Sequence, residues 1–313
     1  MQDQFGRTID YLRISVTDRC NLRCQYCMPA QGVPFVPHAE ILQYEEILRL
    51  MPAFRALGFR KVKLTGGEPL LRSGLQTLVA GLYQAGFEQV TLTTNGILLP
   101  QTLPALRAAG LSAVNISVDT LDRAQFAAIT RRDLLDQVLD GIDAALQTPD
   151  LTVKLNCVPI VQDPENLVRL ALLAKDHPLH VRFIEMMPIG AGKDCQSYDE
   201  AEILRIFNGA VRTCRARRRR AGERASALLR TDGVSGQNRL YQRGQPPVLR
   251  RLQPDSPDLR GLFKDLSAIW RRGGPQGALA QRRVGRTDSR DHCPGHLGKT
   301  GGPSLFTDGA AQR

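Results

Sequence analysis

The chain has 313 residues, is 42% hydrophobic and carries a formal net charge of +11. This length can bury one large core. We expect a cytoplasmic protein, because no apolar run is long enough to span a bilayer and the sequence starting at Met1 lacks the features of a secretory leader. The charge is uneven: residues 211–313 hold 22 Lys and Arg against 8 Asp and Glu, or +14, which leaves −3 for residues 1–210. The first 210 residues therefore lack the basic charge that is typical of nucleic-acid-binding proteins.

From Ile9 to about Phe207, short apolar runs rich in β-branched residues alternate with helical patterns. Strands are expected at 12–16, 61–65, 89–94, 113–118, 152–158 and 181–184, and helices near 44–57, 74–85, 100–109, 133–146, 165–174 and 199–207. Such alternation is typical of repeated βα units around a parallel sheet. Six units predict an α/β fold, an open, partial TIM-type (β/α)6 barrel, in which chemistry sits at the C-terminal ends of the strands.

The periodic pattern fails after about Asn208. Residues 217–220 are four consecutive arginines, and Gly, Pro, Ser and Gln are scattered beyond them without period 2 or period 3.6. We therefore expect a barrel domain at 1–210, followed at 211–313 by a degenerate, disordered, basic tail of low order. An RNA-binding arm is the functional alternative, although the tail has few aromatic side chains to stack on bases.

Three of the seven cysteines form the run C-x3-C-x2-C on the loop after the first expected strand: Cys20, Cys24 and Cys27. Such clustering favours metal ligation in a reducing compartment over a disulfide framework. Three thiolates can hold three irons of a [4Fe–4S] cube and leave the fourth iron open for a substrate or cofactor. A structural zinc site would need a fourth ligand, and no suitably spaced His or Cys follows. The spacing therefore predicts a [4Fe–4S] cluster.

With this cysteine spacing the chain resembles the radical S-adenosylmethionine (SAM) superfamily. The resemblance implies that the amino and carboxylate groups of SAM bind the open iron, and that an electron from the cluster cleaves the C–S bond to give a 5′-deoxyadenosyl radical. Tyr26, inside the cysteine loop, is similar to the aromatic residue that the superfamily places against the adenosine. The segment 65–69, TGGEP, resembles the superfamily's GGEP motif, in which Gly67 lets the backbone approach the methionyl amine.

A closer resemblance, over roughly residues 5–207, is to one family within this superfamily, the GTP 3′,8-cyclases of molybdenum cofactor biosynthesis. It is carried by the segments 10–20, 64–72, 92–96, 115–120, 153–158 and 182–188. It implies that Ser117 and Met187 also contact SAM, and that Arg13, Thr94 and Lys154 contact GTP. Two cations and a hydroxyl at strand ends suit a triphosphate. Taken singly, each of these residues has an alternative role as a strand-end charge, a turn residue or, for the methionine, a core filler.

The chain departs from this family in two places. The family's arginine before the TGGEP segment is Lys63 here, which keeps the charge but loses the bidentate fork, so a weaker contact with GTP is expected. The family also holds guanine on a second [4Fe–4S] cluster through C-x2-C-x13-C and ends in Gly-Gly. The remaining cysteines are too dispersed for that spacing: Cys157, Cys195, Cys214 and Cys293. The second cluster is therefore expected to be absent.

The tail has the composition that GC-rich coding DNA yields in a wrong frame, because CGN, GGN and CCN codons then dominate. Back-translation of residues 236–270, read one nucleotide later, permits a sequence that contains C-x2-C-x13-C. We therefore hypothesise a frameshift near residues 208–211. Resequencing of the gene tests it, since an intact frame with no second-cluster frame beside it would contradict the hypothesis.

The activity that the resemblance implies is conversion of GTP to (8S)-3′,8-cyclo-7,8-dihydroguanosine 5′-triphosphate, and loss of the second-cluster domain is expected to impair or abolish it. Expected partners are an electron donor such as flavodoxin or ferredoxin and, downstream, cyclic pyranopterin monophosphate synthase. No membrane or nucleic-acid partner is expected, and a homodimer is left open. The alternatives are another radical SAM enzyme that acts on a peptide or small molecule, and a basic RNA-binding protein with a structural cluster.

Overall fold

The computed structural model describes residues 2, 6, 8–160, 163–186 and 190–210, together with the backbone of residues 215–218, 226–230 and 237–241. These residues fall in one compact unit, Met1–Gln253, and the second unit, Pro254–Arg313, lies outside them. The division expected at residue 210 stays a prediction, as does the disordered tail for those residues of 211–313 that lie outside the described ones.

Six parallel strands form the sheet that the alternating pattern predicts. They are β1 Tyr11–Ser15, β2 Lys61–Thr65, β3 Gln89–Thr94, β4 Leu111–Ser117, β5 Thr152–Cys157 and β6 Leu179–Ile184. The strands pair in chain order, so each crossover returns the chain to the next position along the sheet. The predicted α/β fold, an open (β/α)6 partial barrel, is confirmed.

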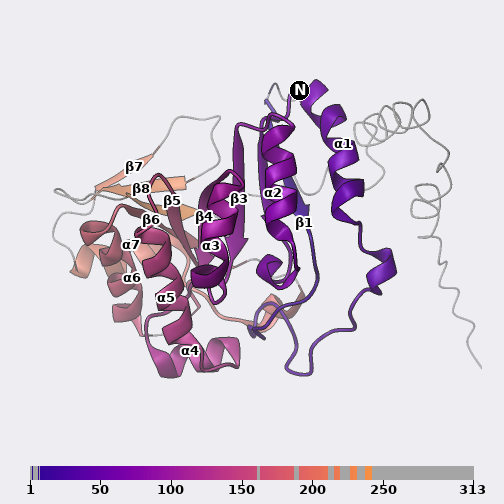
Figure 1. Ribbon diagram of the computed structural model, residues 1–313. Coiled ribbons are helices and arrows are strands. Elements are labelled where there is room, and N and C mark those ends of the chain that lie inside the picture. Colours follow the sequence, from indigo (N-terminus) through magenta and orange to yellow (C-terminus); the bar gives the residue numbers. More distant parts are fainter. Residues whose placement is uncertain are drawn as a thin grey trace, which may run out of the picture. The chain divides into compact units, whose positions relative to one another are not determined.

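Helices connect the strands and lie along one face of the sheet, as Figure 1 shows. They are α1 Tyr44–Ala56, α2 Leu75–Gln84, α3 Leu99–Ala108, α4 Arg123–Thr130, α5 Leu135–Leu146, α6 Pro164–Asp176 and α7 Glu200–Ala210. The sequence analysis missed α4, whose signal is Asp122: its carboxylate accepts from the Gln125 N–H and caps the helix. Within the described ranges, no helix combines the length and the apolar character needed to cross a membrane.

The sheet has two chemically different faces, because side chains alternate along each strand. The face under the helices is apolar, and its side chains, such as Val62, Leu64 and Leu155, are fully buried. Burying each such side chain stabilises the fold by about 1.5–3 kcal/mol. The opposite face, which we call the inner face, carries polar side chains such as Arg13 and Lys63 that stay partly exposed. The helices thus leave the inner face available for a ligand.

Three further strands extend the sheet beyond the predicted elements: β7 Arg215–Arg218, β8 Ser226–Arg230 and β9 Gln237–Tyr241. β9 pairs parallel with β6, and β8 and β7 follow it antiparallel. The sequence analysis expected no strands here, because the segment lacks alternating apolar residues. Pairing uses backbone N–H and C=O groups, which nearly every residue supplies, so strands can add to the open edge of β6 without that pattern.

Helix α5 approaches the loop after β3 so closely that one helix position has no room for a side chain. A Cβ at Gly141 would lie 2.2 Å from the carbonyl oxygen of Gly96. That oxygen belongs to the backbone and cannot rotate away as a flexible side chain could. Gly209, near the end of α7, has by contrast nothing within 4 Å of its Cβ position. A methyl group would therefore clash with the backbone at Gly141 and would extend into open space at Gly209.

Replacing Gly141 with Ala should destabilise the protein by about 2 kcal/mol or more, because the clash exceeds the gain in helix propensity of about 1 kcal/mol. Gly209→Ala is the matched control and should stabilise by up to about 1 kcal/mol. Urea unfolding of both variants measures whether the free energy of unfolding falls or rises relative to wild type. A stabilised Gly141→Ala protein would contradict the close packing of α5 on this loop.

Candidate functional site

The loop after β1 carries the three predicted cluster ligands. Cys20 and Cys24 are half-buried, Cys27 is exposed, and all three thiols are free. The N–H groups of Cys27 and Met28 both donate to the Cys24 carbonyl at 2.9 Å, which turns the chain tightly between the second and third cysteines. The structure thus brings the three cysteines to the C-terminal edge of the sheet.

The Gly66-Gly67 turn after β2 lies directly against the chain that leads into the cysteines. A Cβ at Gly66, whose φ is +154°, would lie 2.4 Å from the Thr17 carbonyl oxygen, and one at Gly67 would lie 2.2 Å from the Arg19 oxygen. Any side chain would push the two segments apart, so glycine is required at both positions. The sequence analysis assigned Gly67 to SAM, which stays a prediction, and the structure adds this packing role.

Glu68 ties the end of β2 to the end of β3 and, through Asn95, to the cysteine loop. Its carboxylate is 1% exposed and accepts from the Leu70 N–H at 3.0 Å, the Thr94 hydroxyl at 2.8 Å and the Asn95 N–H at 2.7 Å. The Asn95 side chain donates in turn to Asn21 at 2.6 Å. Burial raises the pKa of Glu68, and the three hydrogen bonds offset part of that shift. The sequence analysis did not assign this role to Glu68.

Tyr26 is fixed from inside the fold by Asp119, which follows β4. The Tyr26 hydroxyl donates to one carboxylate oxygen at 2.7 Å, and the other oxygen accepts from the Val158 N–H at 2.8 Å. Asp119 is 6% exposed, and burial raises its pKa to about 6 despite both hydrogen bonds. The sequence analysis missed Asp119, for which the available signal is a carboxylate directly after a buried strand. Contact between Tyr26 and adenosine stays a prediction.

The donor set of the cysteine loop fits a cluster that takes three thiolates. The Leu22 N–H donates to the Cys20 sulfur at 3.4 Å, as expected around an iron–sulfur ligand. Among the described residues, no three His, Cys, Asp or Glu side chains could share one metal ion, whereas each thiolate of a [4Fe–4S] cube binds a different iron. Burial raises the pKa of the Cys20 and Cys24 thiols, so ligation must displace their protons.

Cations gather on the inner face of strands β1–β6. Arg13 on β1 lies beside Lys63 on β2, and the strand-to-strand register places Lys154 of β5 and Arg182 of β6 on the same face. The Arg182 guanidinium donates to the Asn115 side chain. None of the inner-face positions of β1–β6 is Asp or Glu. The structure therefore brings three of the predicted GTP contacts, Arg13, Lys63 and Lys154, to one electropositive face.

Thr94 lies on the other face of β3. The register places it beside Ile116, it is 2% exposed, and its hydroxyl donates to Glu68. Thr93 is the threonine that lies on the inner face, beside Asn115. Because neighbouring residues of a strand face opposite sides, Thr93 and not Thr94 shares the inner face with the cations. The sequence T-L-T-T at the end of this strand did not reveal which threonine faces inward.

The remaining predicted SAM contacts are Ser117 and Met187. Ser117 is the last residue of β4, half-buried on the inner face, with Asn156 of β5 beside it. Met187 lies outside the described residues. Its neighbour Met186 is buried in a small apolar cluster against which Tyr26 packs. Both contacts with SAM stay predictions.

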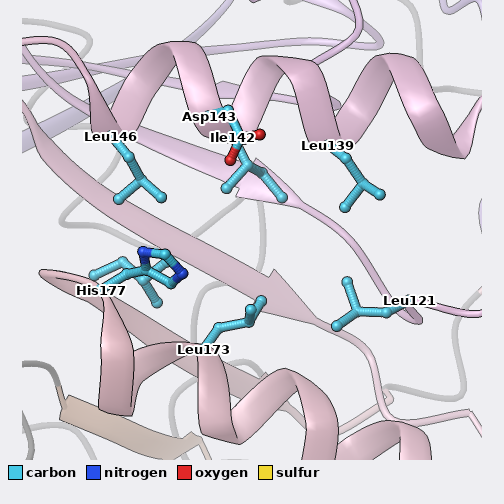
Figure 2. Close-up of a pocket in the computed structure, with 8 residues that line it drawn as sticks. Leu121, Leu139, Ile142, Asp143, Leu146, Leu173 and His177 are labelled. Carbon is cyan, nitrogen blue, oxygen red and sulfur yellow. The ribbon is translucent and has the colours of Figure 1, made fainter.

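A cavity of about 160 Å³ lies between α5 and α6, away from these residues. Figure 2 shows Ile142 and Leu146 of α5 facing Leu173 of α6, with His177 beside them. The cavity is almost entirely apolar, and none of the predicted site residues lines it. It is therefore part of the helix layer and not of the candidate site.

Comparison with known proteins identifies what the chain is similar to. The sequence model of the Radical SAM superfamily matches residues 14–175. Proteins named GTP 3′,8-cyclase from Heliobacterium modesticaldum and Petrotoga mobilis are 52% and 50% identical over 195 residues, which cover 61% of this chain and 59% of each relative. The chain thus spans about three fifths of the length of these relatives. The structure of TYW1 with a lysine-pyruvate adduct bound shares the fold, with a TM-score of 0.52 and 17% identity over 72% of this chain and 81% of that one.

The raised pKa of Asp119 makes stability depend on pH. With a pKa of about 6 in the folded state and roughly 4 in the unfolded chain, the folded state binds this proton more tightly, so stability from protonation is lost as pH rises through 6. Asp119→Asn keeps the shape and cannot titrate. We expect its free energy of unfolding relative to wild type to rise by about 1 kcal/mol between about pH 5 and pH 7. Urea unfolding of the iron-free protein measures it, and a constant difference would contradict the shift.

Proposed function

We propose that this chain, which belongs to the radical SAM superfamily, binds SAM and GTP as the GTP 3′,8-cyclases do and directs a radical to the ribose of the nucleotide. The identity of about half to proteins of that name supports the choice of substrate. The match covers only part of the length of those relatives, so identity alone does not carry their whole activity to this chain. The proposal therefore also uses the features of the site.

The observation that carries the proposal is the cationic inner face. Arg13 and Arg182 can each present a planar pair of donors to a phosphate, and Lys63 and Lys154 add compact charges. None of the inner-face positions of β1–β6 is Asp or Glu, so this face favours an anionic ligand such as a triphosphate. A peptide substrate would bring no comparable set of anions to this cationic face. The face therefore favours GTP over the alternative of a peptide-modifying radical SAM enzyme.

In this proposal Cys20, Cys24 and Cys27 hold a [4Fe–4S] cluster, which together with SAM supplies one-electron cleavage to a 5′-deoxyadenosyl radical. Tyr26 orients the adenosine, and Asp119 holds the Tyr26 ring in place through the hydroxyl. The backbone at Gly67, with Ser117 and Met187, completes the SAM contacts. The task of these side chains is to place the radical carbon against the ribose, since small misplacements cost orders of magnitude in rate.

Two departures shape the proposal. Lys63 replaces the family's arginine, so its phosphate contact is that of a point charge; in this structure its ammonium also lies 5.7 Å from the centre of the Tyr11 ring. Thr94 is enclosed by its contact with Glu68, and we assign the phosphate hydroxyl to Thr93 on the inner face.

The proposal includes poor cyclisation by the chain as it stands. The frameshift near residues 208–211 and the loss of the second cluster concern residues that lie almost entirely outside those described. If the guanine is held by that cluster, the orientation of the base is lost even where the phosphates are bound. An external electron donor such as flavodoxin or ferredoxin, and a synthase acting downstream, belong to the same proposal. The rival RNA-binding function rests on the basic charge of residues 211–313, which lie almost entirely outside the described residues.

Replacing Cys24 with Ala should abolish formation of 5′-deoxyadenosine, because two thiolates do not hold the cluster in place. Cys195→Ser, outside the cysteine loop, is the matched thiol control and should cleave SAM as wild type does.

Anaerobic turnover with dithionite, SAM and GTP follows 5′-deoxyadenosine and the cyclised nucleotide separately. We expect wild type to form 5′-deoxyadenosine with little of the cyclised nucleotide. Unchanged cleavage by Cys24→Ala would refute the cluster assignment. Robust cyclisation by wild type would show that the second cluster is dispensable.

Lys154→Ala should weaken GTP binding about tenfold or more, because a charge-assisted contact to phosphate contributes roughly 1.5–3 kcal/mol. Lys175→Ala, an exposed position on the outer side of α6, makes the same change in net charge and serves as the control. Calorimetric titration at one fixed salt concentration compares GTP with guanosine, whose binding should not change. Equal weakening by both variants, or of both ligands, would argue against Lys154 as a phosphate contact.

A further inference from the structure

Arg131 ends α4 in a conformation that its residue type normally avoids. Its φ is +56° and its ψ +28°, the left-handed region, and Asp150 is the other non-glycine residue with positive φ in the described part of the chain. Glycine usually occupies this position after a helix, because a Cβ makes it costly. The presence of arginine here indicates that the side chain compensates for the strain.

The Arg131 side chain contacts the cysteine loop on both sides of its C-x2-C segment. The Nη1 atom donates to the Arg23 carbonyl at 2.8 Å and to the Met28 carbonyl at 2.9 Å. These two residues directly precede Cys24 and directly follow Cys27. One guanidinium nitrogen therefore holds together the two ends of the segment that carries two of the proposed ligands.

The last turn of α4 reinforces this contact through its backbone. The Arg23 N–H donates to the Thr130 carbonyl and the Gln25 N–H to the Ile129 carbonyl, both at 2.9 Å. Carbonyls at a helix C-terminus lack partners within the helix, and here the cysteine loop supplies them. Cys24 thus lies between two residues whose backbone is fixed by α4, before any metal is bound.

We infer that Arg131 is a positioning residue for the iron–sulfur cluster: it closes the Cys24–Cys27 segment into the shape that ligation needs. The inference rests on the proposed cluster at the three cysteines and not on the identity of the substrate. Groups that orient metal ligands through hydrogen bonds typically change metal retention by roughly 10–100-fold when removed. The Arg131 guanidinium hydrogen-bonds to the cysteine loop, so we expect its effect to act through that loop.

Arg131→Gly separates the side chain from the backbone, because glycine adopts the left-handed conformation without strain and lacks the guanidinium. The full chain is reconstituted anaerobically, and the release of iron to a ferrous chelator is followed over time. We expect release from Arg131→Gly to be roughly 10–100-fold faster than from wild type. The iron-free variant should unfold at the same temperature as wild type or higher, since the backbone strain is relieved.

Arg132→Ala is the matched control, since it removes the next guanidinium, which is exposed and donates to the Arg131 carbonyl. It should release iron at the wild-type rate. Arg131→Lys, which keeps the charge but not the planar donor geometry, should fall between wild type and Arg131→Gly.

Release from Arg131→Gly within about twofold of wild type, or equally fast release from Arg132→Ala, would overturn the inference. So would a matching drop in the unfolding temperature of iron-free Arg131→Gly, because that result assigns Arg131 to general stability. Failure of wild type to take up iron, or equal retention by Cys24→Ala, would instead overturn the proposed cluster itself. The two failures are therefore distinguishable.

Discussion

The backbone ladder between β1 and β2 continues past the ends of both strands. The Val16 N–H donates to Thr65, the Gly67 N–H to Thr17 at 2.7 Å and the Glu68 N–H to Arg19 at 2.6 Å. The last of these bonds lies one residue before the first cysteine of the loop. This continuation is possible because two successive glycines leave the second segment without side chains, so the backbones can touch. The cysteine loop is consequently placed by the main chain, which is more rigid than any side-chain contact.

Two buried carboxylates hold the other strand ends in the same way. Glu68 accepts the N–H of Asn95 beyond β3, and Asp119 accepts the N–H of Val158 beyond β5. Backbone groups at strand ends lose their ladder partners, and a buried one without a partner costs about 1–3 kcal/mol. Burial raises the pKa of both carboxyl groups, so their charged forms are held at a cost. Both carboxylates lie at the edge of the sheet where the candidate site lies, and both connect to the cysteine loop. Glu68 fixes Asn95, whose side chain donates to Asn21, and Asp119 accepts from the Tyr26 hydroxyl.

The sheet also divides charge between its faces. Apolar side chains meet the helices, while Arg13, Lys63, Lys154 and Arg182 gather on the inner face. A surface on which cations gather favours an anionic ligand. A bound anion would stabilise the folded state by mass action. This gathering of cations is the physical link between the fold and the proposed nucleotide site.

Local sequence determined the order of βα units, the six parallel strands and the place of the cysteines, because periodicity, turn residues and spacing are properties of neighbouring residues. Tertiary structure decided the rest. Thr93 and not Thr94 faces inward, and Asp119 accepts a hydrogen bond from Tyr26. Helix α4, which the sequence analysis missed, contacts the cysteine loop through Arg131. The orientation of the two threonines depends on strand register. The contacts of Asp119 with Tyr26 and of Arg131 with the cysteine loop join residues more than 90 positions apart in the sequence. The strands β7–β9 likewise depend on the open edge of β6, since backbone pairing leaves little trace in side-chain pattern.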